Sequence, residues 1–268
     1  MISVHPHVYE RLIERHPDLV DVVVPEAMVT QSAAWHVGGT PSVWLEQFGP
    51  GTVEWLHTDF IGLEHIPDVG ETLVTNGKGT TEDIVAEWVL TAVLMACKRL
   101  GSYKIWSDRY GQKPILLKDA KVVIIGRGAI GRESLELLKR VGARDVAITG
   151  ADHLEPARVA DIVVVATSLR DQTIGLINTS ELELWKLGVW LVSISHGGVI
   201  SDHDLVEGLT KGAPAGAIID CFEEEPLISD SKLWSLAIVS PHLAWYSPES
   251  ADRRVAVFRA RLKQWQEG

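Results

Sequence analysis

The sequence predicts an α/β protein with a doubly wound parallel sheet and a second, smaller α/β unit. The first observation is a set of short apolar runs in the second half of the chain that lack polar alternation. Such runs are typical of parallel strands that helices cover on both faces. The second observation is a glycine-rich turn directly after the first run. The runs are Val122–Ile125, Val146–Ile148, Ile162–Val165, Val189–Val192, Ala217–Ile219 and Ala237–Val239.

Both ends of the chain are expected to form the smaller unit. From Ile2 to about Pro67, short apolar runs alternate with helical or turn segments, a pattern that indicates a small α/β fold. A helix is expected from Ala251 to Gln266, packed back on this first part. The predicted boundaries are therefore 1–78 with 243–268 for the smaller unit and 79–242 for the doubly wound domain.

A long buried helix is predicted from Thr80 to about Leu100. Its apolar positions form a wide face that few charged residues interrupt, and Thr80 or Thr81 is a plausible N-cap. A helix this apolar needs neighbours on more than one side. We therefore expect it at a domain or subunit boundary.

The composition and the chain start exclude several classes of function. The 268 residues suffice for one large or two modest domains, and 46% of them are apolar. The net charge of −11 disfavours nucleic acid as a partner. Cys97 and Cys221 are far apart and outside any CxxC pair, so we expect no metal site and a reducing compartment. Residues 1–5 do not show the charged segment followed by an apolar stretch that is typical of a signal peptide, and no segment approaches the ~18 apolar residues of a membrane span. We therefore expect a cytoplasmic protein without a membrane partner.

The glycine-rich turn predicts a dinucleotide site. It lies between the first apolar run and a helical segment, where glycines permit a tight turn and close approach of the backbone to a pyrophosphate. The alternative is a structural glycine turn. The residues concerned are Gly126, Arg127, Gly128, Ala129, Ile130 and Gly131.

The position that usually holds the adenosine ribose is ambiguous here. An acidic residue is expected about 20 residues after the glycine turn, at the end of the next strand. Gly150 and Ala151 offer no side-chain ligand there, and Asp152 comes one or two positions late. Asp152 is either a ribose ligand or a helix cap. The choice between NAD and NADP stays open.

Glu225 and His242 form a possible acid/base pair, each beside a proline that restricts the backbone. A neighbouring carboxylate favours the imidazolium, so the histidine ring could deliver a proton near neutral pH. Such a proton is what a ketone requires when it is reduced.

Ordered motifs along nearly the whole chain resemble the D-isomer-specific 2-hydroxyacid dehydrogenases, particularly the glyoxylate/hydroxypyruvate reductase-like branch. The resemblance implies a Rossmann domain, a smaller flavodoxin-like α/β substrate domain, and a homodimer formed through the 80–100 helix. The motifs are Asp59–Glu64, Val74–Asn76, Val85–Glu87, the glycine turn, Ala160–Val165, Thr173–Asn178, His196–Ile200, Asp220–Pro226 and Pro241–His242.

The resemblance also implies roles for individual residues. His242 matches the general acid, Glu225 matches the carboxylate that tunes it, and Asp220 matches the residue at the nicotinamide end, with a strand-end cap as its alternative. Ile61 and Gly62 match a loop whose backbone N–H groups bind the substrate carboxylate. The further cofactor and substrate residues are Thr167, Ser168, Thr173, Ser195 and Asn76.

The chain departs from the family at His196, where the motif has an arginine that pairs with the substrate carboxylate and polarises the ketone. Histidine is shorter and offers fewer donors than the planar guanidinium. Loss of a charged donor to a developing oxyanion typically costs ~3 kcal/mol or more, so reduction of an ordinary 2-keto acid should be impaired. Either His196 acts as a protonated electrophile, or the substrate lacks the usual carboxylate, or the site has become non-redox or inactive.

Two further departures concern the binding grooves. The segment from Gly150 to Ala160 is too short for the usual helix, so the adenosine side of the groove is expected to be open. Ten tryptophans accompany four tyrosines and four phenylalanines, and several of them are candidates either to line a pocket or, by ordinary packing, to fill the core. These are Trp35, Trp44, Trp55, Trp88, Trp106 and Trp245.

The sequence therefore predicts an NAD(P)-dependent oxidoreductase that reduces a ketone or 2-keto acid, with a non-standard substrate. One alternative is an enzyme of this family that catalyses an elimination, addition or cyclisation. A second alternative is a non-catalytic protein that senses dinucleotides or binds a partner.

Overall fold

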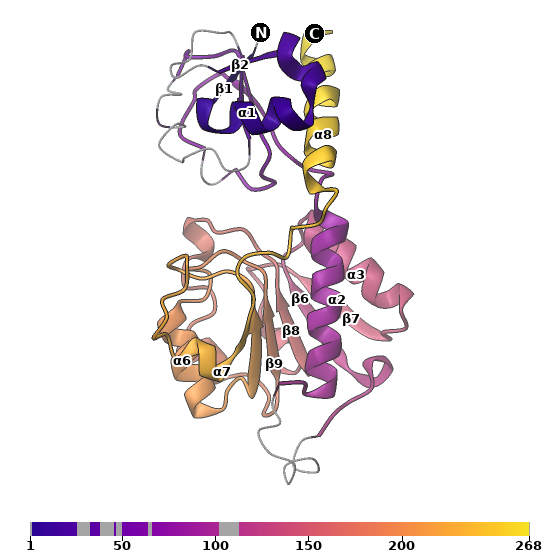
Figure 1. Cartoon of the computed structure of the whole chain (residues 1–268). Helices are drawn as coiled ribbons and strands as arrows, with labels where there is room; N and C mark the ends of the chain where they lie inside the picture. Colours follow the sequence, from indigo (N-terminus) through magenta and orange to yellow (C-terminus); the bar gives the residue numbers. More distant parts are fainter. Residues whose placement is uncertain are drawn as a thin grey trace. The chain divides into compact units, whose positions relative to one another are not determined.

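The structure is a computed structural model that describes residues 2–25, 33–37, 46, 50–63, 66–101 and 113–267. The chain divides into two compact units (Figure 1). Unit 1 consists of residues 1–80 and 248–268, and unit 2 of residues 81–247. Unit 1 therefore contains both ends of the chain.

Unit 2 is built on a six-stranded parallel sheet in the order β11-β10-β9-β8-β6-β7. The fold class predicted from the apolar runs is confirmed, because each run overlaps one strand of this sheet. The strands are β6 (Lys121–Ile125), β7 (Asp145–Thr149), β8 (Ile162–Val165), β9 (Trp190–Ser193), β10 (Gly216–Ile219) and β11 (Ile238–Val239). The helices are α2 (Glu82–Lys98), α3 (Ala129–Arg140), α4 (Glu155–Arg158), α5 (Thr179–Leu182), α6 (Asp202–Lys211) and α7 (Leu233–Leu236).

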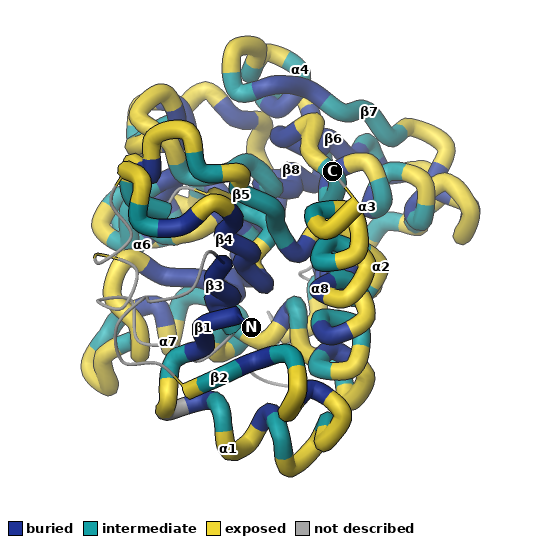
Figure 2. Tube along the Cα trace, turned by 90° about the horizontal axis from the view of Figure 1, so that it is seen from above, coloured by how far each residue is buried: buried dark blue, intermediate teal, exposed yellow. Residues whose placement is uncertain are grey.

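Helices cover both faces of this sheet, which explains why its strands lack polar alternation. Successive strand residues point to opposite faces. Val122 and Ile124 pack with α2 and α3 in one core cluster, whereas Val123 and Ile125 belong to a second cluster with α5, α6 and α7. The central strands are accordingly buried along their length (Figure 2).

The first half of the sheet lacks one strand of the usual dinucleotide-binding order 3-2-1-4-5-6. In unit 2, β7 is the edge strand, and the chain returns through α4 directly to β8 on the other side of β6. The intervening residues 150–161, all described, form a turn and the single helical turn α4. This agrees with the prediction that the segment is too short for a full helix.

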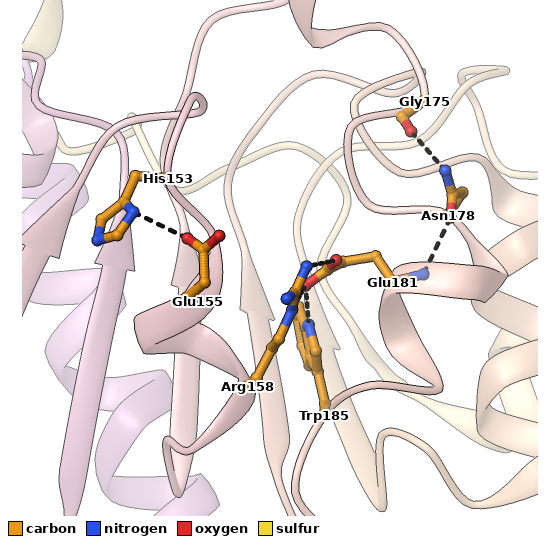
Figure 3. A network of polar contacts seen from close by, with 7 residues as sticks. All are labelled: His153, Glu155, Arg158, Gly175, Asn178, Glu181 and Trp185. Atoms are coloured by element: carbon orange, nitrogen blue, oxygen red, sulfur yellow. Dashed lines mark hydrogen bonds and ion pairs between the residues drawn. The ribbon is translucent and has the colours of Figure 1, made fainter.

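A polar network holds the short helix α4 in place (Figure 3). A four-residue helix is unstable alone and requires tertiary contacts. Arg158 of α4 donates two hydrogen bonds to the buried Glu181 of α5, at 3.1 and 2.8 Å, and Trp185 Nε1 donates a third at 3.2 Å. Asn178 caps α5 by accepting a bond from the Glu181 amide. The network therefore ties the shortened crossover to the rest of the domain.

Helix α2 covers the sheet of unit 2. Most of its buried residues, which include Val89 and Val93, belong to the core cluster that also contains residues of α3 and of the central strands. Thr81 occupies the N-cap, but its hydroxyl makes no capping bond, and the Thr80 hydroxyl donates to the carbonyl of Gly77. The prediction that Thr80 or Thr81 is the N-cap residue is therefore confirmed for Thr81, although its side chain makes no capping bond. No helix among the described residues is both long and apolar enough to cross a membrane.

Unit 1 contains a five-stranded parallel sheet in the flavodoxin-like order β2-β1-β3-β4-β5. The C-terminal helix α8 packs back on this sheet beside α1 (Figure 1), as predicted. Phe258 of α8 stacks on Trp35 with ring centroids 3.7 Å apart. The elements are β1 (Ile2–Val4), α1 (Pro6–Arg15), β2 (Val23–Pro25), β3 (Ala33–His36), β4 (Trp55–Thr58), β5 (Leu73–Thr75) and α8 (Ser250–Gln266).

A fully buried histidine lies in the core of unit 1. His57 of β4 neighbours the aromatic rings of Trp35, Trp55 and Phe258, and its Nδ1 lies 2.9 Å from the Thr75 hydroxyl. Burial, and secondarily the charge of Arg261, lowers the pKa of His57 to about 4. The ring is therefore neutral in the folded protein at neutral pH.

We expect the stability of the protein to fall as the pH drops from 6.5 to 4. In this window the unfolded chain protonates His57 while the folded chain does not, so the free energy of unfolding decreases with falling pH. The lowered pKa corresponds to a loss of about 3 kcal/mol. Urea unfolding at several pH values should show a shallower pH slope for His57→Gln, which does not titrate. Equal slopes for the two proteins would contradict the prediction.

Candidate active site

The loops at the carboxyl ends of β10 and β11 bring Glu225 and His242 together. His242 Nδ1 lies 2.7 Å from Glu225 Oε2, and Glu225 Oε1 accepts a hydrogen bond from the Phe222 amide at 3.0 Å. The side chains of His242 and Glu225 are 37% and 36% exposed. The carboxylate is thus held by the backbone, and the pair is accessible from solvent.

Asp220 holds the loop that carries His242. Its buried carboxylate accepts bonds from the Ser240 hydroxyl at 2.5 Å and from the amides of Leu243 and Ala244 at 2.9 Å. The His242 amide also donates to the Asp220 carbonyl at 2.9 Å. Sequence reasoning did not find these partners of Asp220, because backbone amides leave no mark in a sequence and the contact with Ser240, 20 residues along the chain, arises only in the fold.

The backbone of His242 adopts φ 53°, in the left-handed region that non-glycine residues rarely enter. Such a conformation costs of the order of 1 to 3 kcal/mol and persists only where surrounding contacts enforce it. The bonds from Asp220 provide that enforcement here. Strained residues of this kind cluster at functional sites.

His196 lies next to His242. Their ring centroids are 6.0 Å apart, in an edge-to-face arrangement. Gly197 allows the loop after β9 to lie against the loop after β10, because a Cβ atom at that position would lie 2.1 Å from the Phe222 carbonyl oxygen. Unit 2 therefore gathers all three residues predicted to be catalytic.

The glycine turn has the geometry that a pyrophosphate requires. A Cβ on Gly126 would lie 2.3 Å from the Ala166 carbonyl oxygen, and one on Gly131 would lie 2.0 Å from the Gly126 carbonyl oxygen. A Cβ on Gly128 would meet no protein atom within 4 Å. Gly128 is also the N-cap of α3, whose first N–H groups have no partner within the helix. The first and third glycines thus serve packing, whereas the second leaves space for an anion at the helix start.

The ribose position carries charges of both signs. Arg127 Nη1 lies 4.0 Å from Asp152 Oδ1, and both side chains are mostly exposed. The Arg127 guanidinium also lies close to Gly150, since a Cβ there would be 3.3 Å from its central carbon. The N-cap of α4 is Leu154, so the interpretation of Asp152 as a helix cap is wrong. This arrangement offers a carboxylate for a 2′-hydroxyl and a cation for a 2′-phosphate.

The remaining predicted cofactor residues follow the ends of β8 and β9. The Thr167 amide donates to the Ser195 hydroxyl at 3.0 Å and links the two loops, and Ser168 lies in the first of them. The Thr173 hydroxyl donates to the Ser168 carbonyl at 2.7 Å and accepts from the Arg170 amide. Thr173 is buried and stabilises its own loop by these bonds.

The three residues predicted to bind substrate lie in unit 1. Asn76 Nδ2 donates to the Ile61 carbonyl at 2.6 Å, which joins the loops after β4 and β5. Gly62 follows in the same loop. Ile61, Gly62 and Asn76 are thus adjacent at the carboxyl ends of parallel strands, where ligands of α/β sheets bind.

Unit 1 also contains a pocket of about 270 Å³ between α1, the ends of β3 and β4, and the start of α8. Arg11, Arg15 and Arg254 line it, with Trp35 and Asp59. Trp35 therefore fills the core, as ordinary packing predicts, and also contributes to the wall of this pocket.

The other tryptophans differ in their placement. Trp55 is fully buried, and Trp88 packs against the α2 core, as ordinary packing predicts. Trp245 is half-buried beside Tyr246. Trp44 and Trp106 lie outside the described residues.

Comparison with known proteins identifies the family. The profile "D-isomer specific 2-hydroxyacid dehydrogenase, NAD binding domain" matches residues 90–244, more than half of the chain. A glyoxylate reductase of Aeropyrum pernix is 29% identical over 225 residues, which cover 73% of this chain and 67% of the relative. A D-2-hydroxyacid dehydrogenase (NAD(+)) of Clostridioides difficile is 26% identical over 213 residues, 71% of this chain and 61% of the relative. The chain thus matches about two thirds of the length of these relatives.

A solved structure supports the same fold. One such structure is the NADPH-dependent glyoxylate/hydroxypyruvate reductase of Sinorhizobium meliloti in complex with NADP and sulfate. It superimposes with a TM-score of 0.83 at 18% identity, and the match covers 100% of this chain and 95% of the reductase chain. The chain belongs to the D-isomer specific 2-hydroxyacid dehydrogenase family and is an NAD(P)-dependent, dehydrogenase-like oxidoreductase.

Proposed function

We propose that this protein reduces a ketone or 2-keto acid by hydride transfer, with His242 and Glu225 as the acid pair, and that its substrate is not an ordinary small 2-keto acid. The observation that carries the proposal is the 2.7 Å contact between His242 Nδ1 and Glu225 Oε2, with His196 alongside.

The contact assigns different tasks to the two nitrogens of His242. Nδ1 faces the Glu225 carboxylate, which orients the ring through this hydrogen bond. Nε2 is then the atom that can donate a proton to the substrate oxygen. Asp220 acts as a positioning residue, because its carboxylate holds the loop that carries His242.

The proposed cofactor site combines the glycine turn with the loops after β8 and β9. The turn from Gly126 to Gly131 would hold the pyrophosphate, and Asp152 or Arg127 the ribose. A bound nicotinamide supplies the hydride. Thr167, Ser168, Thr173, Ser195 and Asp220 would surround the nicotinamide end, and Ile61, Gly62 and Asn76 would bind the substrate.

The proposal of a non-standard substrate rests on His196. An imidazole cannot form the two parallel hydrogen bonds that a guanidinium makes with a carboxylate. The carboxylates of Glu223 and Glu225 place further negative charge at this end of the sheet, which opposes an anion. We therefore favour a substrate whose reacting ketone carries a neutral or weakly anionic neighbour. No observation on the described residues favours the non-redox or the sensing alternative.

Titration with NADH and NADPH, followed by nicotinamide fluorescence, tests the proposal. We expect one of them to bind, and we expect Gly128→Ala to weaken that binding at least tenfold with little change in stability, because its Cβ projects into the cofactor space. Gly131→Ala, the matched control, should instead destabilise the fold, because its Cβ would contact the Gly126 carbonyl at 2.0 Å. Absence of binding by both cofactors would refute the oxidoreductase proposal.

Two further expectations concern assembly and location. The family resemblance implies a homodimer through α2, whose Leu94 is 39% exposed and at whose C-terminal end Leu100 is 48% exposed. Mass measurement in solution should give twice the 29.5 kDa of the chain, and a monomer would contradict this proposal. A cytoplasmic location is proposed from the same family and from the sequence.

A further inference from the structure

We infer that Cys221, Glu225 and His242 form a binding site for a zinc ion, which inhibits the enzyme by occupying its acid pair. Each of the three residues offers one ligand atom, and these atoms all lie within 4.8 Å of one another. Sequence reasoning expected no metal site, because it considered the spacing of the cysteines and not the fold around Cys221. The inhibition, but not the binding, depends on the proposed function.

The chemistry of the three ligands is that of zinc. Thiolate, imidazole and carboxylate are its usual protein ligands, at about 2.3, 2.0 and 2.1 Å from the ion. In a tetrahedral site these bond lengths place the ligand atoms roughly 3.5 Å apart. The largest separation in the cluster is at most 4.8 Å, little more than 1 Å longer than this, whereas the 2.7 Å contact between His242 Nδ1 and Glu225 Oε2 is shorter. Small side-chain rotations can close the first difference and open the second. Three protein ligands leave the fourth position for water.

The burial of the ligands defines how the ion would enter. Cys221 is 8% exposed and lies at the back of the site, whereas the side chains of Glu225 and His242 are each more than one third exposed. An ion can therefore reach the carboxylate and the imidazole from solvent and then meet the thiol behind them. Binding releases the thiol proton to solvent.

The surroundings favour a cation. The carboxylates of Asp220, the preceding residue, and of Glu225 lie near the Cys221 thiol and place negative charge around it. The same carboxylates attract a divalent ion, and its charge offsets the cost of forming the thiolate. Glu223 adds a further negative charge at this end of the sheet, where it accepts a bond from the Asp202 amide.

Zinc would compete with catalysis because it requires the acid pair. The His242 Nδ1 to Glu225 Oε2 contact must open or rearrange to admit the ion. An imidazole that binds zinc through Nδ1 cannot become an imidazolium, so its Nε2–H is a much weaker acid toward the substrate oxygen. Bound zinc therefore inhibits, although Cys221 itself has no part in the reaction.

Direct titration of the full chain with zinc chloride, by calorimetry after treatment with a chelator, tests the site. We expect one zinc ion per chain at micromolar affinity in the wild type and at least tenfold weaker binding in Cys221→Val. Cys97→Val is the matched control, because it makes the same change at the other buried cysteine of the chain. Wild-type protein that binds no zinc, or Cys221→Val that binds it equally well, overturns the inference.

Two further measurements separate the parts of the proposal. Cobalt(II) should produce a thiolate charge-transfer band in the wild type and in Cys97→Val but not in Cys221→Val. If the valine variant does not fold, Cys221→Ser replaces it and should also lack the band. With an active preparation, zinc should inhibit the wild type and Cys97→Val at least tenfold more strongly than Cys221→Val. Equal inhibition of all three proteins overturns the role of Cys221. An inactive preparation affects only the proposed function, because the calorimetry requires no turnover.

Discussion

His242→Ala should lower kcat for ketone reduction by between a hundredfold and ten-thousandfold, the range that one positioned general acid contributes. The variant removes the ring whose Nδ1 contacts Glu225 and whose other nitrogen faces away from that carboxylate. Cofactor binding should persist, because the glycine turn lies elsewhere in unit 2. Single-turnover oxidation of the bound nicotinamide, compared with fluorescence titration of binding, separates the two effects.

The left-handed backbone at His242 requires a second variant. Alanine tolerates φ 53° poorly, so His242→Ala can shift the loop as well as remove the acid. Asparagine is enriched in this region, and His242→Asn should therefore keep the backbone while removing the imidazole. Both variants should lose activity to a similar extent. His203→Ala, at an exposed histidine of α6, is the matched control and should retain it. Substantial turnover in His242→Asn would remove His242 from the reaction.

The central sheet of unit 2 could be predicted from sequence because each of its strands is marked by its own short stretch of residues. Each strand is a run of apolar residues, and because both of its faces are covered, successive side chains are apolar on both faces. The shortened segment after β7 was equally visible, because a chain of that length has no room for a full crossover helix. The family motifs then placed Glu225, His242 and His196 in one site.

Other parts of the site depend on contacts between distant residues and left no local pattern. The amides of Leu243 and Ala244 bind Asp220 whatever their side chains, so the support of His242 was invisible in the sequence. Asp152 resembled a helix cap because capping residues precede helices, but the chain adds two residues before α4 begins. Cys221 was discounted as a ligand because its neighbours in space are four and more residues away. The relative importance of the three glycines also emerged only from their surroundings.

His196→Arg should raise kcat/KM for glyoxylate or hydroxypyruvate by about a hundredfold, which corresponds to about 3 kcal/mol. The side chain at this position is exposed and lies beside His242, so a longer group has space to reach a substrate in front of that ring. A guanidinium there can bind the carboxylate through two parallel hydrogen bonds and polarise the ketone. The gain should appear in both kcat and KM, because the same group acts on the ground state and on the developing charge.

The control for this variant addresses charge alone. The chain carries a net charge of −11, so any added cation could attract an anionic substrate and raise kcat/KM without entering the site. His203→Arg adds the same charge on α6, outside the proposed site, and such long-range attraction weakens as salt increases. A gain confined to His196→Arg and retained at high salt would show that position 196 limits the reduction of 2-keto acids. An equal gain in both variants, or none in either, would mean that His196 is compatible with ordinary 2-keto acids and that the proposal of a non-standard substrate is wrong.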